Sequence, residues 1–233
     1  MESNSAKKRA VAKLGGLCAF GVLCLVAARY GAAAKPAANA GMPAETMKAA
    51  ALPAAGTYKI DSNHSFAYFG ARHHVVGLVR GRFDKVTGTI VSGKDPAACS
   101  VDVAIDLASV STQNTKRDED LRSDAYFDVT KFPTMTYRGS GIHRVSGNMW
   151  VMDGSLTLHG VTKVVPLTFT FNGVFPNMPA DAPARAAFHA TAGVKRAEFG
   201  IGARDNLDEL GMLQTPDVQI EIDVEADANS TKM

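Results

Sequence analysis

Three stretches of the chain alternate apolar and polar side chains with a period of two. They cover residues 101–107, 165–171 and 218–224. Val, Ile, Leu or Phe occupies the odd-numbered positions in the first two stretches and the even-numbered positions in the third. Because successive side chains of a strand point to opposite faces, each stretch has one apolar and one polar face. This pattern predicts antiparallel sheet with one side buried and the other in water.

More strands are expected between turn signals such as VSGKDPAA and VSGN. About eight strands at this spacing predict a single all-β domain, either an antiparallel barrel or a sandwich. The additional strands are predicted near residues 64–72, 78–91, 134–145, 148–159 and 184–198.

Helix is scarce, with one candidate at residues 111–127 and a second near residues 204–213. The first is polar and has Ser or Thr available as its N-cap. It holds the densest charge cluster, in which Asp118, Glu119 and Asp120 could form an acid/base or cation site. A solvated helical turn explains them better, because acidic residues suit a helix N-terminus and can pair with a nearby arginine.

The N-terminus has the organisation of an export signal, in which basic residues precede the apolar run 14–28. Fifteen apolar residues are short for a membrane-spanning helix, which needs about 20. We therefore expect residues 1–40 to be a cleaved signal peptide and the protein to be periplasmic, with a retained N-terminal anchor as the alternative. Residues 41–56 are predicted to be an Ala/Pro-rich linker, and residues 57–228 the ordered domain.

The net charge and the number of cysteines both change when the predicted signal at residues 1–40 is left out of the count. The chain has 25 Lys and Arg and 23 Asp and Glu, but six of these basic residues and one acidic residue lie in the first forty. The remaining 19 basic and 22 acidic residues give a net charge of −3, so we expect no nucleic-acid partner. Cys99 is the one cysteine outside the signal, which predicts a structural thiol and no internal disulfide.

The sequence lacks the common catalytic and metal-binding motifs. It contains no G-x-S-x-G, no phosphate-binding loop, no C-x-x-C and no H-E-x-x-H, and GIGARD at 200–205 lacks the third glycine of a dinucleotide loop. We therefore predict no catalytic residue, no bound metal and no cofactor.

Three histidines nevertheless fall within HSFAYFGARHH at 64–74. On one straight strand His64 and His74 would lie roughly 33 Å apart, and the adjacent His73 and His74 would point to opposite faces. These histidines alone make a poor metal site. A site that His143, His159 or His189 completes from other strands stays open.

Aromatic residues are spread over most of the expected strands. They fit either a solid core or a hollow barrel that holds an apolar ligand, and a barrel of eight strands is close to the size at which both occur. The pattern alone leaves the two alternatives open.

Five blocks of sequence follow one another along the chain. They are YKIDSNHSFAYFGARH (58–73), GRFDKVTGTI (81–90), TQNTKRDEDLRSDAYFDVTKFPTMTY (112–137), GSLTLHGVTKVVPL (154–167) and VKRAEFGI (194–201). In this order they resemble the YceI-like family of exported, lipocalin-like proteins associated with polyisoprenoid binding, over about residues 58–226. Two departures are Asp120, where the family often has histidine, and Val194-Lys195 in place of Ile-Asn.

The resemblance implies an eight-stranded antiparallel lipocalin-like β-barrel with one or two short helices and a long apolar channel. It implies a non-enzymatic periplasmic protein that sequesters or carries a polyisoprenoid or prenyl-quinone-like lipid. Membrane contact would come through the signal or anchor, or through lipid exchange, and a homodimer stays open. The alternatives are an enzyme acting on an isoprenoid or quinone-like substrate in the same pocket, and a filled-core stress-response or interaction barrel.

The ligand would contact apolar side chains along the channel and a few polar groups near its mouth. The polar candidates are His64, Ser65, His73 and Arg117. The apolar candidates are Phe66, Tyr68, Phe69, Phe83, Phe127, Phe132, Leu156, Leu158, Phe169, Phe171 and Phe199.

Overall fold

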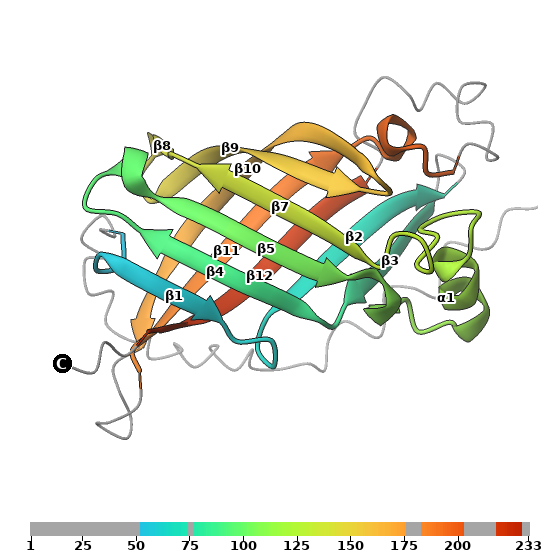
Figure 1. The fold of residues 1–233 in the computed structure, drawn as a ribbon, viewed down its shortest axis with the longest axis horizontal. Helices are drawn as coiled ribbons and strands as arrows, with labels where there is room; N and C mark the ends of the chain where they lie inside the picture. The colour runs from blue at the N-terminus through green and yellow to red at the C-terminus, as the bar shows by residue number, and fades with distance from the viewer. Residues whose placement is uncertain (1–51, 74–76, 176–182, 203–217, 230–233) are drawn as a thin grey trace, which may run out of the picture. The chain divides into compact units, whose positions relative to one another are not determined.

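A computed structural model describes residues 52–73, 77–175, 183–202 and 218–229, which form the β-structure shown in Figure 1. The predicted signal at 1–40, most of the linker, His74 and the second helix candidate at 204–213 lie outside these residues. The helices of the described part are too short or too polar to cross a membrane.

Eight antiparallel strands close into a barrel, which confirms the predicted fold class. The ring runs in the order β1-β4-β5-β7-β9-β10-β11-β12, and β12 pairs with β1 to close it. Their bounds are β1 Gly56–Ile60, β4 Val86–Ser92, β5 Ser100–Asp106, β7 Thr134–Ser140, β9 Met149–Leu158, β10 Val161–Phe175, β11 Arg185–Val194 and β12 Val218–Ala228.

The barrel interior is built by the alternation seen in the sequence. In β9 the residues Trp150, Met152, Gly154, Leu156 and Leu158 are buried, while the residues that alternate with them are exposed or partly exposed. Closure leaves the ring without a free edge, so the backbone groups of these strands are paired around the barrel. The core therefore lies inside a single closed sheet.

Two stretches of the barrel wall are each interrupted between consecutive strands. In the first, β1 and β2 (Phe66–His73) are separate strands that pair with successive parts of β12. In the second, β4 follows β3 (Gly77–Phe83) after a break at Asp84–Lys85. The prediction of one strand over 78–91 was therefore wrong. The break is stabilised by the 3-10 turn η2 (Leu107–Ser109), because the amide of Asp84 donates to the carbonyl of Ser109 at 3.3 Å.

The predicted strand 134–145 is also two strands, β7 and β8 (His143–Ser146). Gly141 separates them with a φ of 72°, a conformation that favours glycine. Its amide donates to the carbonyl of Cys99 at 2.8 Å, and the amide of Ile142 donates to the carbonyl of Pro96 at 3.0 Å. The chain therefore folds over one end of the barrel here, next to the 3-10 turn η1 (Pro96–Ala98).

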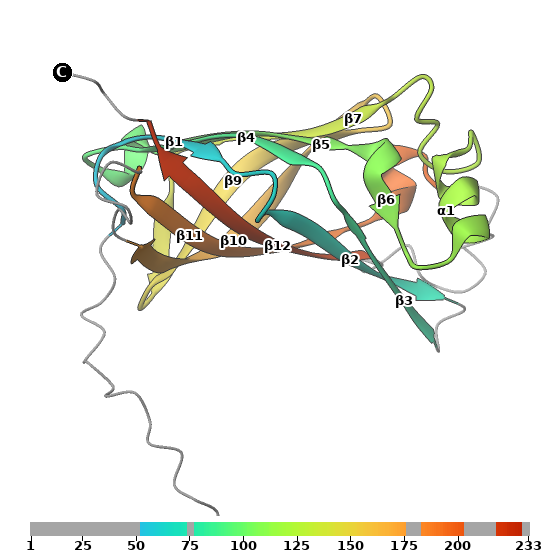
Figure 2. The same ribbon diagram turned by 90° about the horizontal axis from the view of Figure 1, so that it is seen from below.

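The two ends of the barrel differ. We call the end that carries residues 52–56, 92–100 and 140–149 the hairpin end, and the end that carries residues 107–134 and 194–201 the helix end (Figures 1 and 2). The helix end holds α1 (Thr115–Arg122), η2 (Leu107–Ser109), β6 (Val110–Ser111) and η3 (Arg196–Phe199).

Helix α1 is shorter than the predicted 111–127, and its N-cap is Asn114 rather than Ser or Thr. The side chain of Asn114 accepts a hydrogen bond from the amide of Arg117 at 3.0 Å. Arg122 fastens the helix to the barrel, because its guanidinium donates to the carbonyls of Ala108 at 2.9 Å and Val110 at 2.7 Å. The helix end is therefore closed by a hydrogen-bonded cover.

Candidate functional site

The barrel interior contains an apolar cavity of about 140 Å³, here called cavity 1, that reaches toward the hairpin end. Its wall is made of inward-facing side chains from β4, β5, β7, β9, β10, β11 and β12. Leu52, Pro53 and Ile142, which lie outside the strands, cover it at the hairpin end. The interior is therefore hollow here.

A second apolar cavity of about 100 Å³, cavity 2, lies toward the helix end. It is lined by residues of β2 and β12, by Leu121 of α1, and by Tyr126 and Phe127 from the segment after α1. Met135 and Ile220 line both cavities. The two spaces are thus neighbours inside one barrel, separated by side chains rather than by backbone.

Tyr137 is the main polar group in the wall of cavity 1. Its hydroxyl lies 3.1 Å from the carbonyl oxygen of Met152 and 3.0 Å from that of Val165, to which it donates. Burial raises the pKa of Tyr137 to about 12, so the phenol stays protonated under physiological conditions. Among the described residues of this wall, the other titratable side chain is Cys99.

The buried thiol of Cys99 has local partners. It accepts a hydrogen bond from the amide of Gly93 at 3.4 Å and lies 3.6 Å from the carbonyl oxygen of Asp95. Neither it nor Tyr137 has a base or acid beside it in the cavity wall as described. The wall of cavity 1 is suited to holding apolar groups rather than to moving protons.

Seven of the predicted channel residues line the cavities. Leu156 and Phe169 line cavity 1, and cavity 2 is lined by Tyr68, Phe69, Phe83, Phe127 and Leu158. These residues occur on strands that the sequence pattern had identified, or in the segment after α1.

The other four apolar candidates lie elsewhere. Phe66 packs under the guanidinium of Arg82, 4.8 Å from its ring centre, and Phe132 packs edge-on against His159. Phe171 and Phe199 are buried in the core but are absent from the walls of both cavities as described. Most of the wall of cavity 1 is aliphatic, and the strand parity of 101–107 and 218–224 was the signal that could have found it.

The four polar candidates are not brought together. Ser65 is fully buried in the break between β1 and β2, where its hydroxyl accepts from the amide of Glu225 at 3.1 Å. His64 is exposed beside it on the outer face. Arg117 lies at the helix end, where it donates to the hydroxyl of Thr112 at 2.8 Å, and His73 ends β2. Their part in ligand binding stays a prediction.

The acidic residues of α1 have separate surroundings. Asp118 is buried, and its carboxylate accepts from both the amide and the hydroxyl of Thr112, at 2.8 and 2.5 Å. Glu119 and Asp120 are exposed. Asp118 therefore holds the start of the helix against the preceding strand, and these three carboxylates do not converge on one site.

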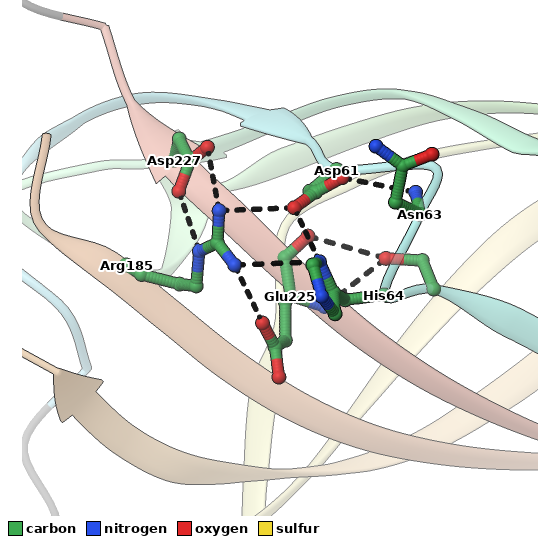
Figure 3. A network of polar contacts seen from close by, with 7 residues as sticks. Asp61, Asn63, His64, Arg185, Glu225 and Asp227 are labelled. Carbon is green, nitrogen blue, oxygen red and sulfur yellow. Dashed lines mark hydrogen bonds and ion pairs between the residues drawn. The ribbon is translucent and has the colours of Figure 1, made fainter.

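A polar cluster on the outer face spans the break between β1 and β2 (Figure 3). Arg185, the first residue of β11, donates to Asp227 at 2.7 Å and to Glu225 at 2.9 Å, and its ion pair with Asp61 is 2.9 Å long. His64 lies 2.7 Å from Asp61. The sequence did not reveal this cluster, because it joins segments that are distant in the chain.

The charges in this cluster shift one another's ionisation. The hydrogen bond from His64, assisted by the amide of Asn63 and the guanidinium of Arg185, holds the pKa of Asp61 below its ordinary value of 3.8. The hydrogen bond to Asp227 raises the pKa of Arg185. Because the carboxyl pKa is lower in the folded protein, the stability from Asp61 is present above its ordinary pKa and is lost as the pH falls through the folded value.

Replacing Arg185 by methionine is expected to destabilise the barrel by about 2 kcal/mol at pH 7, because three carboxylates lose their shared cation. This corresponds to a fall in Tm of roughly 4–8 °C. The loss should shrink toward pH 3, where protonation removes the repulsion. Thermal melts at both pH values measure it, with Arg138→Met as control, since the exposed Arg138 pairs with Asp102. An equal loss at both pH values would contradict the electrostatic explanation.

Two groups of described residues bring possible metal ligands within 4.8 Å of one another. In the first, Asp61, His64 and Glu225, the guanidinium of Arg185 already neutralises the carboxylates. In the second, Nδ1 of His189 lies 2.8 Å from Asp223, and Glu221 is more distant, at 4.0 Å from Nε2. The second group is the one the sequence left open through His189, whereas His159 packs against Phe132.

Comparison with known proteins identifies relatives that are similar in sequence and in structure. A UPF0312 protein of Yersinia pestis (strain Pestoides F) is 35% identical over 150 residues, which cover 63% of this chain and 77% of the relative. The crystal structure of the Campylobacter jejuni YCEI protein is 28% identical, with a TM-score of 0.57 over 68% of this chain and 90% of that one.

A polyisoprenoid binding domain from Saccharophagus degradans shares the fold at lower identity. It is 20% identical, with a TM-score of 0.54, and the match covers 73% of this chain and 98% of that domain. The family model of the YceI-like domain matches residues 58–226, which is nearly the whole described barrel. The chain therefore belongs to the YceI-like family.

Proposed function

We propose that this protein binds a long apolar lipid, of the polyisoprenoid or prenyl-quinone class, inside the barrel and carries or sequesters it without chemical change. The observation that supports this most is the pair of adjoining apolar cavities, which share Met135 and Ile220. Two adjoining apolar cavities inside one barrel suit a linear apolar chain that extends through both.

The physical basis is the hydrophobic effect. Each methylene-sized group that leaves water for the cavity contributes about 0.8 kcal/mol, so affinity grows with the length of the chain that can be accommodated. The structurally similar domain from Saccharophagus degradans is described as a polyisoprenoid binding domain, which supports the same ligand class. Lipid would fill both cavities when the side chains between them move aside.

The rival function, an enzyme acting on an isoprenoid or quinone-like substrate, receives less support. The titratable groups that line cavity 1 among the described residues are Tyr137, whose hydroxyl is engaged by backbone carbonyls, and Cys99. General acid–base chemistry needs a group whose pKa lies near the working pH. Tyr137 has a pKa of about 12 and does not meet that requirement.

The periplasm is the proposed location, on the basis of the signal-like sequence at residues 1–40. A periplasmic binding protein could take a membrane lipid from one surface and deliver it to another. No cofactor other than the bound lipid is part of this proposal.

Native mass spectrometry and organic extraction of the protein, purified from an exporting bacterium, test the function directly. We expect a co-purifying prenyl lipid, or stoichiometric uptake of an added prenyl quinone by protein that arrives empty. A parallel metal analysis covers the group around His189. Protein that arrives empty and fails to take up the added quinone would exclude the proposal.

A further inference from the structure

Exposed apolar side chains are concentrated at the hairpin end. Six large apolar side chains are exposed in the described part of the chain, and four of them lie on strand ends at this end of the barrel. They are Val145 and Met149, which flank the β8–β9 turn, and Val174 and Phe175, which end β10. Phe175 is 60% exposed and Val145 57%. We call these four residues the apolar rim.

The other two exposed apolar side chains lie toward the helix end. Leu78 is near the start of β3 and is 41% exposed, and Val164 is near the start of β10 and is 70% exposed. The same strand, β10, therefore carries exposed apolar residues near both of its ends. This provides a matched comparison between the ends.

Positive charge accompanies the apolar rim. Residues 142–150, which include β8 and the turn, contain His143 and Arg144 and no acidic residue. Both of these side chains are exposed, and the guanidinium of Arg144 lies 5.1 Å from the ring centre of Trp150. Apolar residues beside a cation, here Arg144, and an aromatic ring are a combination that binds the interface of an anionic bilayer.

The apolar rim also lies where lipid could reach the interior. Cavity 1 extends toward this end and is covered there by short segments at Leu52–Pro53 and Ile142. The helix end is covered instead by α1, which Arg122 fastens to two backbone carbonyls.

We propose that the hairpin end docks on an anionic phospholipid surface through the apolar rim and Arg144, and that lipid passes between the bilayer and cavity 1 there. This inference rests on the proposed function for the direction of lipid transfer. Docking itself depends on the exposed side chains and their charge, and it can be measured without any bound lipid.

Trp150, the single tryptophan of the chain, is a built-in reporter because it lies next to the β8–β9 turn. The protein, expressed with its own leader and purified as the bacterium processes it, is mixed with vesicles of phosphatidylglycerol and phosphatidylcholine that carry brominated acyl chains. We expect quenching of Trp150 fluorescence that weakens at high salt and with phosphatidylcholine alone. The variants compared below carry the same leader, so a difference in quenching between them reports the rim and not the leader.

The double variant Met149→Ser/Phe175→Ser should reduce vesicle affinity at the hairpin end about tenfold, as judged by quenching. The matched variant Leu78→Ser/Val164→Ser should leave it unchanged. Vesicle flotation without quenching, or equal losses in the two variants, would overturn the proposal. So would the absence of vesicle binding, or a dimer in analytical ultracentrifugation that only the first variant dissociates, since the rim would then be a contact between copies.

The mass spectrum of the same sample separates this proposal from the proposed function. A protein that retains prenyl lipid but shows no quenching contradicts docking alone. A protein that is quenched but cannot take up prenyl quinone supports docking and contradicts the lipid-carrier function.

Discussion

Replacing Ala190 by phenylalanine is expected to abolish lipid binding while leaving the barrel folded. Ala190 points inward from β11, where it lies opposite Phe169 and Ile222, and all three residues line cavity 1. A phenyl ring would occupy much of a cavity of about 140 Å³. Bound prenyl lipid, quantified by native mass spectrometry, should fall at least tenfold, because the channel is blocked near its middle.

The control is the same substitution on the other face of the same strand. Ala187 points outward and lies opposite Glu225 on β12, so Ala187→Phe adds a ring outside the barrel. Lipid binding should be unchanged in this variant. If Ala190→Phe does not fold, Ala192→Leu offers a smaller side chain in the same wall. Full lipid retention in a folded Ala190→Phe protein would show that cavity 1 is not the binding site.

Replacing Gly154 by alanine is expected to cost about 3 kcal/mol, a large share of the stability of an ordinary domain. A methyl group at Gly154 would overlap the phenol ring of Tyr137, whose hydroxyl reaches backbone carbonyls of β9 and β10. The ring cannot withdraw without giving up its hydrogen bonds to the carbonyls of Met152 and Val165. Thermal melts should show a fall in Tm of roughly 6–12 °C.

Two comparisons show whether the clash with the ring is the cause. Gly56→Ala in β1 should be nearly neutral, because the nearest atoms to the added methyl group lie 4.0 Å away. In a Tyr137→Ala background, Gly154→Ala should cost little, since the ring is gone. A cost of the same size in both backgrounds would mean that the backbone at Gly154, and not the phenol, sets the requirement for glycine.

The absence of side chains at Gly154 and at its partner on β7 also affects the shape of cavity 1. Gly154 pairs with Gly139 of β7, where an added Cβ would lie 2.5 Å from the sulfur of Met152. Two paired glycines thus make room for two large inward side chains, one aromatic and one flexible. The tyrosine and methionine occupy space that would otherwise extend cavity 1 toward β7 and β9.

The sequence was sufficient to predict most of the strand-forming segments and the all-β class of fold. Period-two alternation at 101–107, 165–171 and 218–224 is a local property, because each side chain's face follows from its position in the strand. The same parity identified the polar outer face of β12. Five ordered blocks then indicated the YceI-like family, which the family model confirms.

The interruptions in the strands could not be read from the same signal. Residues 78–91 contain no proline, and Asp84 and Lys85 look like ordinary polar positions in a strand. They interrupt the strand because their backbone amides donate hydrogen bonds to Ser109, which is distant in the sequence. Only the tertiary structure brings Ser109 to this position. Ser65, in the break between β1 and β2, is likewise buried through its hydrogen bond to the backbone of Glu225 in β12.

The sequence by itself determined which residues face inward, since that depends on neighbours two positions apart. The tertiary structure alone decided which of those inward residues line a cavity and which fill the core. Leu156 lines cavity 1 whereas Phe171 packs against Phe188, although both point inward from strands of the ring. Likewise, Arg185 meets Asp61 only because β12 lies between β11 and β1. Strand register and ring closure set these distances, and neither is encoded by local alternation.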